Sequence, residues 1–217
     1  MTILIASATP AEIEITKQFL ENSHFRINQH PIDLLITGIG GIATTYSLTK
    51  SIQRKRPEYI IQAGIAGSFS NEMPLGTTVC VREEIMGDLG AEENSGFTDV
   101  FDLGLMKEND LPFTNKALIN PFLTERNGFG LPVVRSISIN EITTRKGRID
   151  LLQGKFSPDV ESMEGAAFHY VCLRENIPFI QIRAISNYVG ERNKDKWRIG
   201  LAIENLNSAL MNALRQL

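Results

Sequence analysis

The chain has 217 residues, of which 42% are hydrophobic and 22% are charged, and its formal net charge is −3. This balance is typical of a globular protein with one sizeable core, so we expect a single domain over residues 1–217. The sequence pI is about 5.7, and the longest basic run is only Arg54-Lys55-Arg56. A nucleic-acid-binding domain usually carries a basic stripe, so the composition argues against a nucleic-acid partner.

The apolar runs and the two cysteines indicate a reducing, aqueous compartment. Cys80 and Cys172 stand among apolar neighbours, which favours buried reduced thiols over a disulfide. No apolar run approaches the length of a membrane span, and Ile3–Ala6 at the start of the sequence has the pattern of a strand and not of a signal peptide. We therefore expect a cytoplasmic protein without a membrane partner.

Short apolar runs alternate with amphipathic stretches along most of the chain, which is typical of βα units in a largely parallel sheet covered by helices. The predicted strands are Thr2–Ala6, Asp33–Thr37, Tyr59–Ala63, Thr77–Arg82, Val133–Ser138 and Pro178–Ile185. The predicted helices are Pro10–Glu21, Ile42–Arg54, Thr143–Gln153, Met163–Glu175 and Lys194–Leu217. Between Gly87 and Pro132 the chain is rich in Gly, Asp, Glu, Asn and Pro, and we expect a long active-site or interface loop there.

Two glycine-rich segments follow predicted strands. Thr37–Ala43 matches the G-x-G-x-x-A form of a dinucleotide-binding turn, but the next strand ends in Gln62-Ala63-Gly64 and lacks the carboxylate that would hold a ribose hydroxyl. Ala63–Ser68 again places glycines where a small ligand can approach backbone amides. Together they suggest a shared crevice, although either segment on its own could simply be a tight turn.

A carboxylate stands at the start of a buried helix. Glu164 precedes Ala166, Ala167 and Phe168, and an acid at a helix N-terminus usually serves only to favour the helix dipole. Because the following residues indicate burial, an unpaired Glu164 would be costly unless a ligand's hydroxyl pair meets it.

At this point the sequence resembles the superfamily of nucleoside phosphorylases and nucleosidases. That superfamily carries a Met-Glu pair at this helix start and Arg-Ala-Ile-Ser followed by Asp or Asn at the end of the next strand, and this chain has Met163-Glu164 and Arg183-Ala184-Ile185-Ser186-Asn187. The resemblance implies a three-layer α/β/α sandwich with a mixed, largely parallel central sheet. It also implies that Met163 packs against a ribose, that Glu164 accepts hydrogen bonds from the 2′- and 3′-hydroxyls, and that Asn187 faces the purine N7.

Within the superfamily, the chain is most similar to the futalosine hydrolases, which release hypoxanthine in menaquinone biosynthesis. The similarity is carried by Ala8–Glu12, Gly87–Glu93 and Ser186–Asn193. Nucleosidases that act on adenine compounds have Asp where this chain has Asn187. An Asp can protonate N7, whereas a carboxamide can donate to a 6-oxygen and accept from N7–H, which suits hypoxanthine or guanine.

Glu12 is the candidate for activating the nucleophile. It resembles the water-activating Glu of the nucleosidases, but Thr9-Pro10-Ala11-Glu12 is also a helix capping box, so both roles stay open. Related phosphorylases have Gly-Asp-Pro and a following Arg in place of Ala8-Thr9-Pro10, and that Arg is missing here, which favours water over phosphate. One departure is Ile65, where the nucleosidases often have Ser.

The expected site therefore has Glu12, Glu164 and Asn187 as catalytic residues. The residues expected to bind substrate are Met163, Ala63, Gly64, Ile65 and Ile139. No metal site is expected, because the three histidines stand far apart without ligand spacing, and no organic cofactor is expected either. The acidic residues Asp88, Glu92 and Glu93 could form a solvated loop or a lid over the base.

Three alternatives to futalosine hydrolysis stay open. A purine nucleoside phosphorylase would require phosphate, a nucleosidase for methylthioadenosine and S-adenosylhomocysteine would prefer adenine compounds, and a non-catalytic nucleoside-binding protein would bind without releasing base. The expected partner is a purine nucleoside. The resemblance further implies a homo-oligomer, a dimer or tetramer, with Phe97, Phe101 and Phe113 as candidates for completing a neighbour's pocket.

Overall fold

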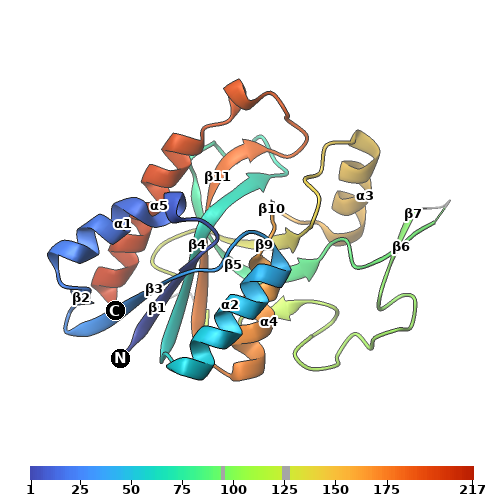
Figure 1. Ribbon diagram of the computed structural model, residues 1–217. Helices are drawn as coiled ribbons and strands as arrows, with labels where there is room; N and C mark the ends of the chain where they lie inside the picture. The colour runs from blue at the N-terminus through green and yellow to red at the C-terminus, as the bar shows by residue number, and fades with distance from the viewer. Residues whose placement is uncertain (94–95, 124–127) are drawn as a thin grey trace.

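A computed structural model describes residues 1–93, 96–123 and 128–217 of the protein. Within these residues a nine-stranded mixed sheet runs through the centre (Figure 1), in the order β10-β9-β5-β11-β4-β1-β3-β2, with β8 paired to β5. Its strands are β1 (Ile3–Ser7), β2 (Arg26–Ile27), β3 (His30–Ile36), β4 (Tyr59–Ser68), β5 (Thr78–Met86), β8 (Leu118–Ile119), β9 (Val133–Ser138), β10 (Val160–Ser162) and β11 (Phe179–Tyr188).

Helices cover both faces of this sheet. On one face α1 (Pro10–Asn22) and α5 (Ile199–Gln216) pack against the core of β1, β4 and β11. On the other face α2 (Gly41–Arg54) packs beside α4 (Gly165–Glu175), as Figure 1 also shows. These layers confirm the predicted α/β/α fold with a mixed sheet. Among the described helices, none combines the length and apolar character that crossing a membrane requires.

The short strand β10 closes part of the sheet into a ring. It pairs in parallel with β9 and antiparallel with the end of β4. Since β4, β11, β5 and β9 are already neighbours in the sheet, five strands form a closed circuit, filled on the inside by small aliphatic side chains such as Val79, Val81 and Val160. The sequence did not predict β10, which holds only three residues.

Most predicted elements agree with the structure to within a few residues, and the departures fall near the carboxyl ends of the strands. The segment Ala63–Ser68, predicted as a turn, continues β4, because it forms ladder bonds with β11 on one side and β10 on the other. Helix α4 begins at Gly165, so Met163 lies just before it and Glu164 is its N-cap. The last predicted helix is a 3₁₀ turn (Lys194–Lys196) followed by α5.

The expectation of one long loop over residues 87–132 is wrong in part. This stretch contains the hairpin of β6 (Gly90–Glu93) and β7 (Gly96–Asp99), and it also contains β8. Phe113 is buried, packing edge-on against Phe101, so it is part of this chain's own core and is not available to a neighbouring chain. Helix α3 (Lys146–Phe156) packs against the end of β9.

Candidate active site

A cavity of about 300 Å³ lies at the carboxyl ends of β1, β4 and β11, the edge at which α/β proteins usually bind ligands. It brings together six of the eight predicted site residues, which come from five separate stretches of the chain: Glu12, Ile65, Ile139, Met163, Glu164 and Asn187. Ala63 and Gly64 lie in β4 behind this wall and do not line the cavity. The remaining lining includes Glu161, Ile142 and Trp197.

Glu12 lies in the first turn of α1 and is buried. One carboxylate oxygen, Oε2, accepts hydrogen bonds from the Thr9 backbone N–H at 2.9 Å and from the hydroxyls of Thr9 and Ser7, each at 3.0 Å. The other oxygen, Oε1, accepts from the Ile65 backbone N–H at 3.1 Å. The capping contact is therefore present, but it uses one oxygen and leaves Oε1 at the cavity with room for a further donor.

Gly64 is required by the close approach of two side chains. A Cβ at this position would lie 2.4 Å from Arg183 Nη1 and 3.1 Å from Glu12 Oε1. Gly64 therefore acts from behind the wall, by letting Arg183 and Glu12 reach the backbone of β4. The glycine is needed for this space and not for a turn.

Glu164 joins the starts of two helices and a buried arginine. Its Oε1 accepts a hydrogen bond from the backbone N–H of Gly40, the N-cap residue of α2, at 3.0 Å, and its Oε2 lies 3.5 Å from Arg183 Nη1. Arg183 is itself buried and also donates to Gln62 Oε1 at 3.1 Å. A carboxylate has about four acceptor positions, so Glu164 retains capacity for two further donors such as a sugar diol.

Below Glu164, a second buried acid supports the start of α4. Ser138 Oγ donates to Glu84 Oε2 at 3.0 Å and accepts from the Ala166 backbone N–H at 2.7 Å. Gln181 Nε2 donates to Glu84 Oε1. Burial is the main cause that raises the pKa of Glu84, and hydrogen bonds and the charge of Arg183 oppose it. The position of Glu164 thus rests on a polar network under its own helix.

Asn187 lies on the other side of the cavity, at the end of β11. Its Oδ1 accepts from Ser186 Oγ at 2.8 Å, and its Nδ2 donates to the Tyr188 carbonyl at 3.2 Å. These two hydrogen bonds determine which side of the carboxamide carries the oxygen and which carries the nitrogen. The oxygen and nitrogen of Asn187 each retain one position for a bound base.

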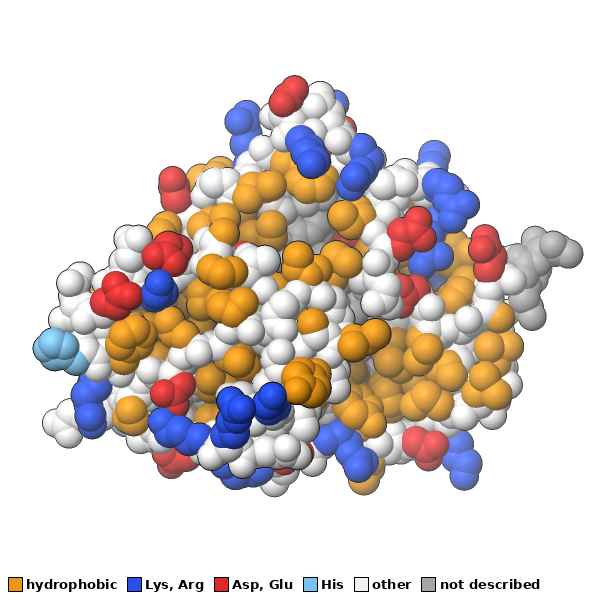
Figure 2. All heavy atoms as spheres, viewed as in Figure 1, with side chains coloured by type: hydrophobic (Ala, Val, Ile, Leu, Met, Phe, Trp, Pro, Cys, Tyr) orange, Lys and Arg blue, Asp and Glu red, His pale blue; other side chains and the backbone are white. Residues whose placement is uncertain are grey.

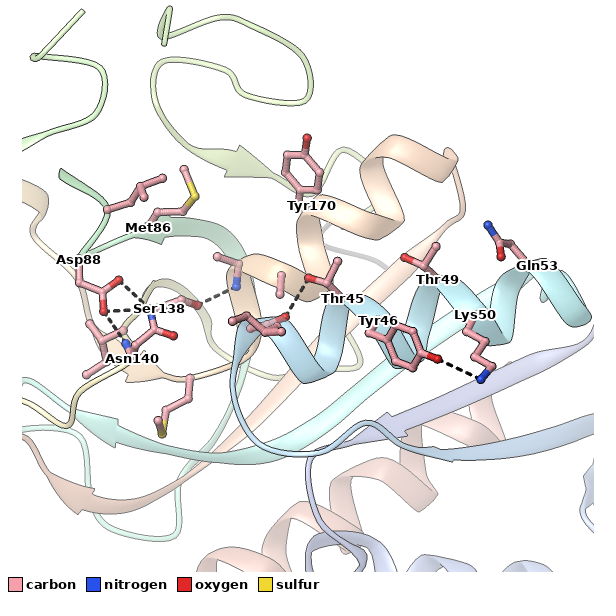
Figure 3. A pocket seen from close by; sticks show the side chains of 17 residues that line it. Thr45, Tyr46, Thr49, Lys50, Gln53, Met86, Asp88, Ser138, Asn140 and Tyr170 are labelled. Carbon is pink, nitrogen blue, oxygen red and sulfur yellow. Dashed lines mark hydrogen bonds between the residues drawn. The ribbon is translucent and has the colours of Figure 1, made fainter. Parts of the chain in front are cut away.

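A larger groove of about 970 Å³ adjoins the cavity and shares Ile139 and Met163 with it. Figure 3 shows its walls: Tyr46, Thr49 and Lys50 of α2 on one side and Tyr170 of α4 on the other. Figure 2 shows hydrophobic side chains gathered between α2 and the β6–β7 hairpin. Asp88 belongs to this groove, where it accepts hydrogen bonds from Asn140, and it does not reach the small cavity. Glu92 is exposed, and the side chain of Glu93 lies outside the described residues.

Two residues of this region received no role in the sequence-based prediction. Arg183 was quoted only as part of a motif, although a charged side chain inside the apolar run of β11 is itself a signal of a buried ion pair. Glu161 was not predicted as a site residue, because the three-residue strand β10 is too short to show a strand pattern in the sequence. Both cysteines are free and buried, as expected, and the described residues contain no group of three His, Cys, Asp or Glu side chains that could hold a metal.

Comparison with known proteins identifies the family of the chain. Residues 3–216 match the model of the phosphorylase superfamily. The chain is 31% identical to futalosine hydrolase of Streptomyces coelicolor, covering 97% of this chain and 94% of that one, and 31% identical to the Thermus thermophilus futalosine hydrolase, covering 84% and 79%. It is 28% identical to 5′-methylthioadenosine/S-adenosylhomocysteine nucleosidase of Oceanobacillus iheyensis, covering 89% of each chain.

Solved structures show the same fold at lower identity. A nucleosidase from Colwellia psychrerythraea in complex with adenine superposes with a TM-score of 0.82 at 21% identity, covering 100% of this chain and 96% of that one. Futalosine hydrolase of Helicobacter pylori superposes with a TM-score of 0.80 at 16% identity, covering 100% and 98%. The chain therefore belongs to the phosphorylase superfamily and is an N-glycosyl hydrolase of the nucleosidase type.

Proposed function

We propose that the protein hydrolyses futalosine to hypoxanthine and dehypoxanthine futalosine, a step of menaquinone biosynthesis by the futalosine route. The observation that carries this proposal is the convergence of Glu12, Glu164 and Asn187 on one cavity. The 31% identity to two futalosine hydrolases supports this substrate, and the groove beside the cavity offers space for a large 5′ substituent.

In this proposal Glu12 activates water. Cleavage of an N-glycosidic bond develops positive charge on the ribose, which a carboxylate can stabilise, and the attacking water must lose a proton. Among the described residues, the Ile65 N–H is the only hydrogen-bond partner of Glu12 Oε1, so this oxygen can accept the proton of a water held in the cavity. Oε2 stays engaged with Thr9 and Ser7 and keeps the carboxylate in place.

Glu164 and Met163 bind the sugar. The two free acceptor positions of Glu164 match the 2′- and 3′-hydroxyls, and the half-buried Met163 supplies an apolar surface beside them. The charge of Arg183 compensates Glu164 within a buried pair. Ile65 and Ile139 complete the apolar wall of the cavity.

Asn187 selects the base. Its oxygen accepts from N7–H of a 6-oxopurine and its nitrogen donates to the 6-oxygen, whereas a 6-amino group would bring a donor against that nitrogen. Water is the preferred nucleophile, because the carboxylates of Glu12 and Glu164 line the cavity and the guanidinium of Arg183 is engaged beneath it. A phosphate dianion would meet repulsion there.

The direct test is to incubate the pure protein, without added metal or cofactor, with futalosine, inosine and methylthioadenosine, each with and without phosphate. We expect hypoxanthine from futalosine at a rate that phosphate leaves unchanged. Release that requires phosphate would identify a phosphorylase, and tight binding without free base would identify a binding protein.

The second candidate function is the hydrolysis of methylthioadenosine or S-adenosylhomocysteine. It is favoured by the 28% identity to a relative of that name over 89% of the chain. The same incubation separates the two functions, because adenine would then be the base released and futalosine would stay intact.

We also propose that the protein acts in the cytoplasm as a homo-oligomer, a dimer or tetramer. The support for association is the groove between α2 and α4, where Ile42 is 88% exposed and Tyr46 is 64% exposed, a density of exposed apolar side chains typical of an interface. Phe97 and Phe101 are half-buried and could still contribute. Light scattering that finds a fully active monomer would contradict this proposal.

A further inference from the structure

One acid of the cavity has no function in the scheme above. Glu161, the middle residue of β10, lines the cavity and is 6% exposed. Its Oε2 is buried and finds no hydrogen-bond partner among the described residues. A buried carboxyl oxygen without a partner is costly, and such groups occur where a ligand or a proton transfer makes use of them.

The backbone places Glu161 next to Asn187. Glu161 pairs with Gly67 across the β10–β4 ladder, and Asn187 pairs with Gly67 across the β11–β4 ladder. A Cβ at Gly67 would lie 3.2 Å from Asn187 Nδ2 and 3.4 Å from Glu161 Cγ. The two side chains therefore converge over the same glycine, at the side of the cavity that we assign to the purine.

The surroundings of Glu161 favour its protonated form. Burial raises the pKa of Glu161 to about 7. Hydrogen bonding by Thr143 and the positive charge of Arg148 on α3 lower this pKa, but they do not outweigh burial. Among the described residues, the other charged groups around the cavity are Glu12 on α1, Glu164 before α4 and Arg183 on β11, and the last two are paired with each other. An acid with these properties can release a proton near neutral pH.

We propose that Glu161 is the general acid of the reaction, donating its proton to the departing purine while Asn187 holds the base in place. The inference rests on the proposed function, and it supplies the proton that a carboxamide cannot give. Asn187 orients the base, and Glu161 neutralises the negative charge that builds up on it.

The step is balanced in atoms and electrons. Water forms the new C1′–O bond and gives one proton to Glu12. The C1′–N9 bond breaks, its electron pair stays with the purine, and the purine takes the proton of Glu161 at a ring nitrogen. After product release, Glu12 loses a proton to solvent and Glu161 gains one, so no further reactant is needed.

The test compares the steady-state kinetics of the wild-type protein with those of Glu161→Gln, Glu161→Asp and a control, Glu72→Gln, on futalosine. Glu72 is exposed and does not line the cavity, so the control makes the same chemical change outside the site. We expect Glu161→Gln to lower kcat by about 100-fold or more, with KM within about threefold. Glu161→Asp should recover part of the loss, and the control should match the wild type.

The pH profile separates an acid from a merely structural residue. Wild-type kcat should fall as the pH rises through about 7, since Glu161 then loses its proton, and the Gln variant should lack this fall. A substrate methylated at purine N7 leaves as a stable neutral base without taking up a proton. The loss caused by Glu161→Gln should shrink on that substrate, and if the wild type excludes it, the pH comparison decides alone.

A Glu161→Gln variant that keeps wild-type kcat, or one that keeps the fall of activity above pH 7, would overturn this role. A wild-type protein that leaves futalosine intact would instead contradict the proposed function itself. The thermal midpoint of each variant shows that it is folded, and Glu161→Gln should be at least as stable as the wild type at pH 8, because it removes a buried ionisable group.

Discussion

Glu164 meets a helix start, a buried guanidinium and the cavity at once. Replacing it with Gln removes the charge but keeps the size. We expect Glu164→Gln to cost about 3 kcal/mol of transition-state stabilisation, on the order of 100-fold in kcat/KM. The control Glu175→Gln changes a partly exposed acid at the end of the same helix. Equal kcat/KM in the two variants would remove Glu164 from the mechanism.

Asn187 decides which base the site accepts. In Asn187→Asp the Nδ2 donor is replaced by an oxygen that repels a purine 6-oxygen. We therefore expect release of hypoxanthine from futalosine to fall at least tenfold, roughly the free energy of one hydrogen bond, with any residual activity shifted toward methylthioadenosine. The measurement is the ratio of kcat/KM for the two substrates. An unchanged ratio would refute the assigned base recognition.

Gly64 lies behind the cavity wall and leaves the space that Arg183 and Glu12 occupy. Its replacement by Ala would push a methyl group to 2.4 Å from Arg183 Nη1, so we expect an activity loss of more than tenfold together with a stability loss of about 1 to 3 kcal/mol. Gly147→Ala is the matched control, because nothing lies within 4 Å of the added Cβ in α3. That control should leave kcat unchanged and stability equal or slightly higher in urea unfolding.

At the scale of elements, α5 fixes the position of α1. Asn207 is fully buried: its Oδ1 accepts from the backbone N–H and hydroxyl of Thr16, and its Nδ2 donates to the Glu12 carbonyl at 2.9 Å. The two helices are therefore joined through the same turn that presents Glu12 to the cavity.

We expect Asn207→Leu to cost about 3 kcal/mol, because it leaves buried partners on α1 unsatisfied, and to lower kcat through Glu12. Urea unfolding and steady-state kinetics measure the two effects. Ser208→Ala, an exposed change on the next residue, should alter stability by less than about 0.5 kcal/mol. If Asn207→Leu left kcat untouched, the coupling of α5 to Glu12 would be contradicted.

The elements that the sequence predicted well are those with local signals. Pro10 at the first position of α1 and the apolar run Ile3–Ala6 of β1 define their elements without help from the rest of the chain. The end of β4 was misread because Gly64 and Gly67 indicate turns locally, while two non-local ladders hold them in a strand. At the end of β4, pairing with two neighbouring strands therefore outweighs the local turn propensity of the glycines.

The same distinction explains the site. Glu12, Glu164 and Asn187 could be nominated because each stands beside a motif, and the structure places them around one cavity. Glu161 could not, because its position depends on β10 pairing with strands about 25 and 95 residues away in the sequence. Its proposed role follows from that pairing and from no local pattern.

For the whole molecule, two buried groups give stability opposite dependences on pH. The pKa of Glu161 rises from 4.5 to about 7, so its contribution is fully present below pH 4.5 and is lost as the pH rises through 7. Burial lowers the pKa of His169 from 6.5 to about 3, so its contribution is present above pH 6.5 and is lost as the pH falls through 3. Between pH 4.5 and 6.5 both groups change the free energy of unfolding with pH: Glu161 lowers it as the pH rises, and His169 raises it.

Comparing the wild type with Glu161→Gln isolates the contribution of Glu161 to the pH dependence of stability. The free energy of unfolding of the wild type, minus that of Glu161→Gln, should fall by roughly 3 kcal/mol between pH 4 and pH 8.5, as expected from a shift of about 2.5 pKa units. Urea unfolding at several pH values gives this difference, and His169 cancels because both proteins contain it. A difference that is flat with pH would show that Glu161 titrates as an exposed acid does.

The bond between Gly40 and Glu164 has a thermodynamic consequence for the molecule. Gly41, the next residue of α2, lines the large groove, so whatever fills the groove and moves α2 also moves a donor of Glu164. Occupancy of the groove and affinity for the sugar are then linked quantities, and linkage is reciprocal: a groove occupant that tightens sugar binding by some factor is itself held more tightly, by that factor, when sugar is bound.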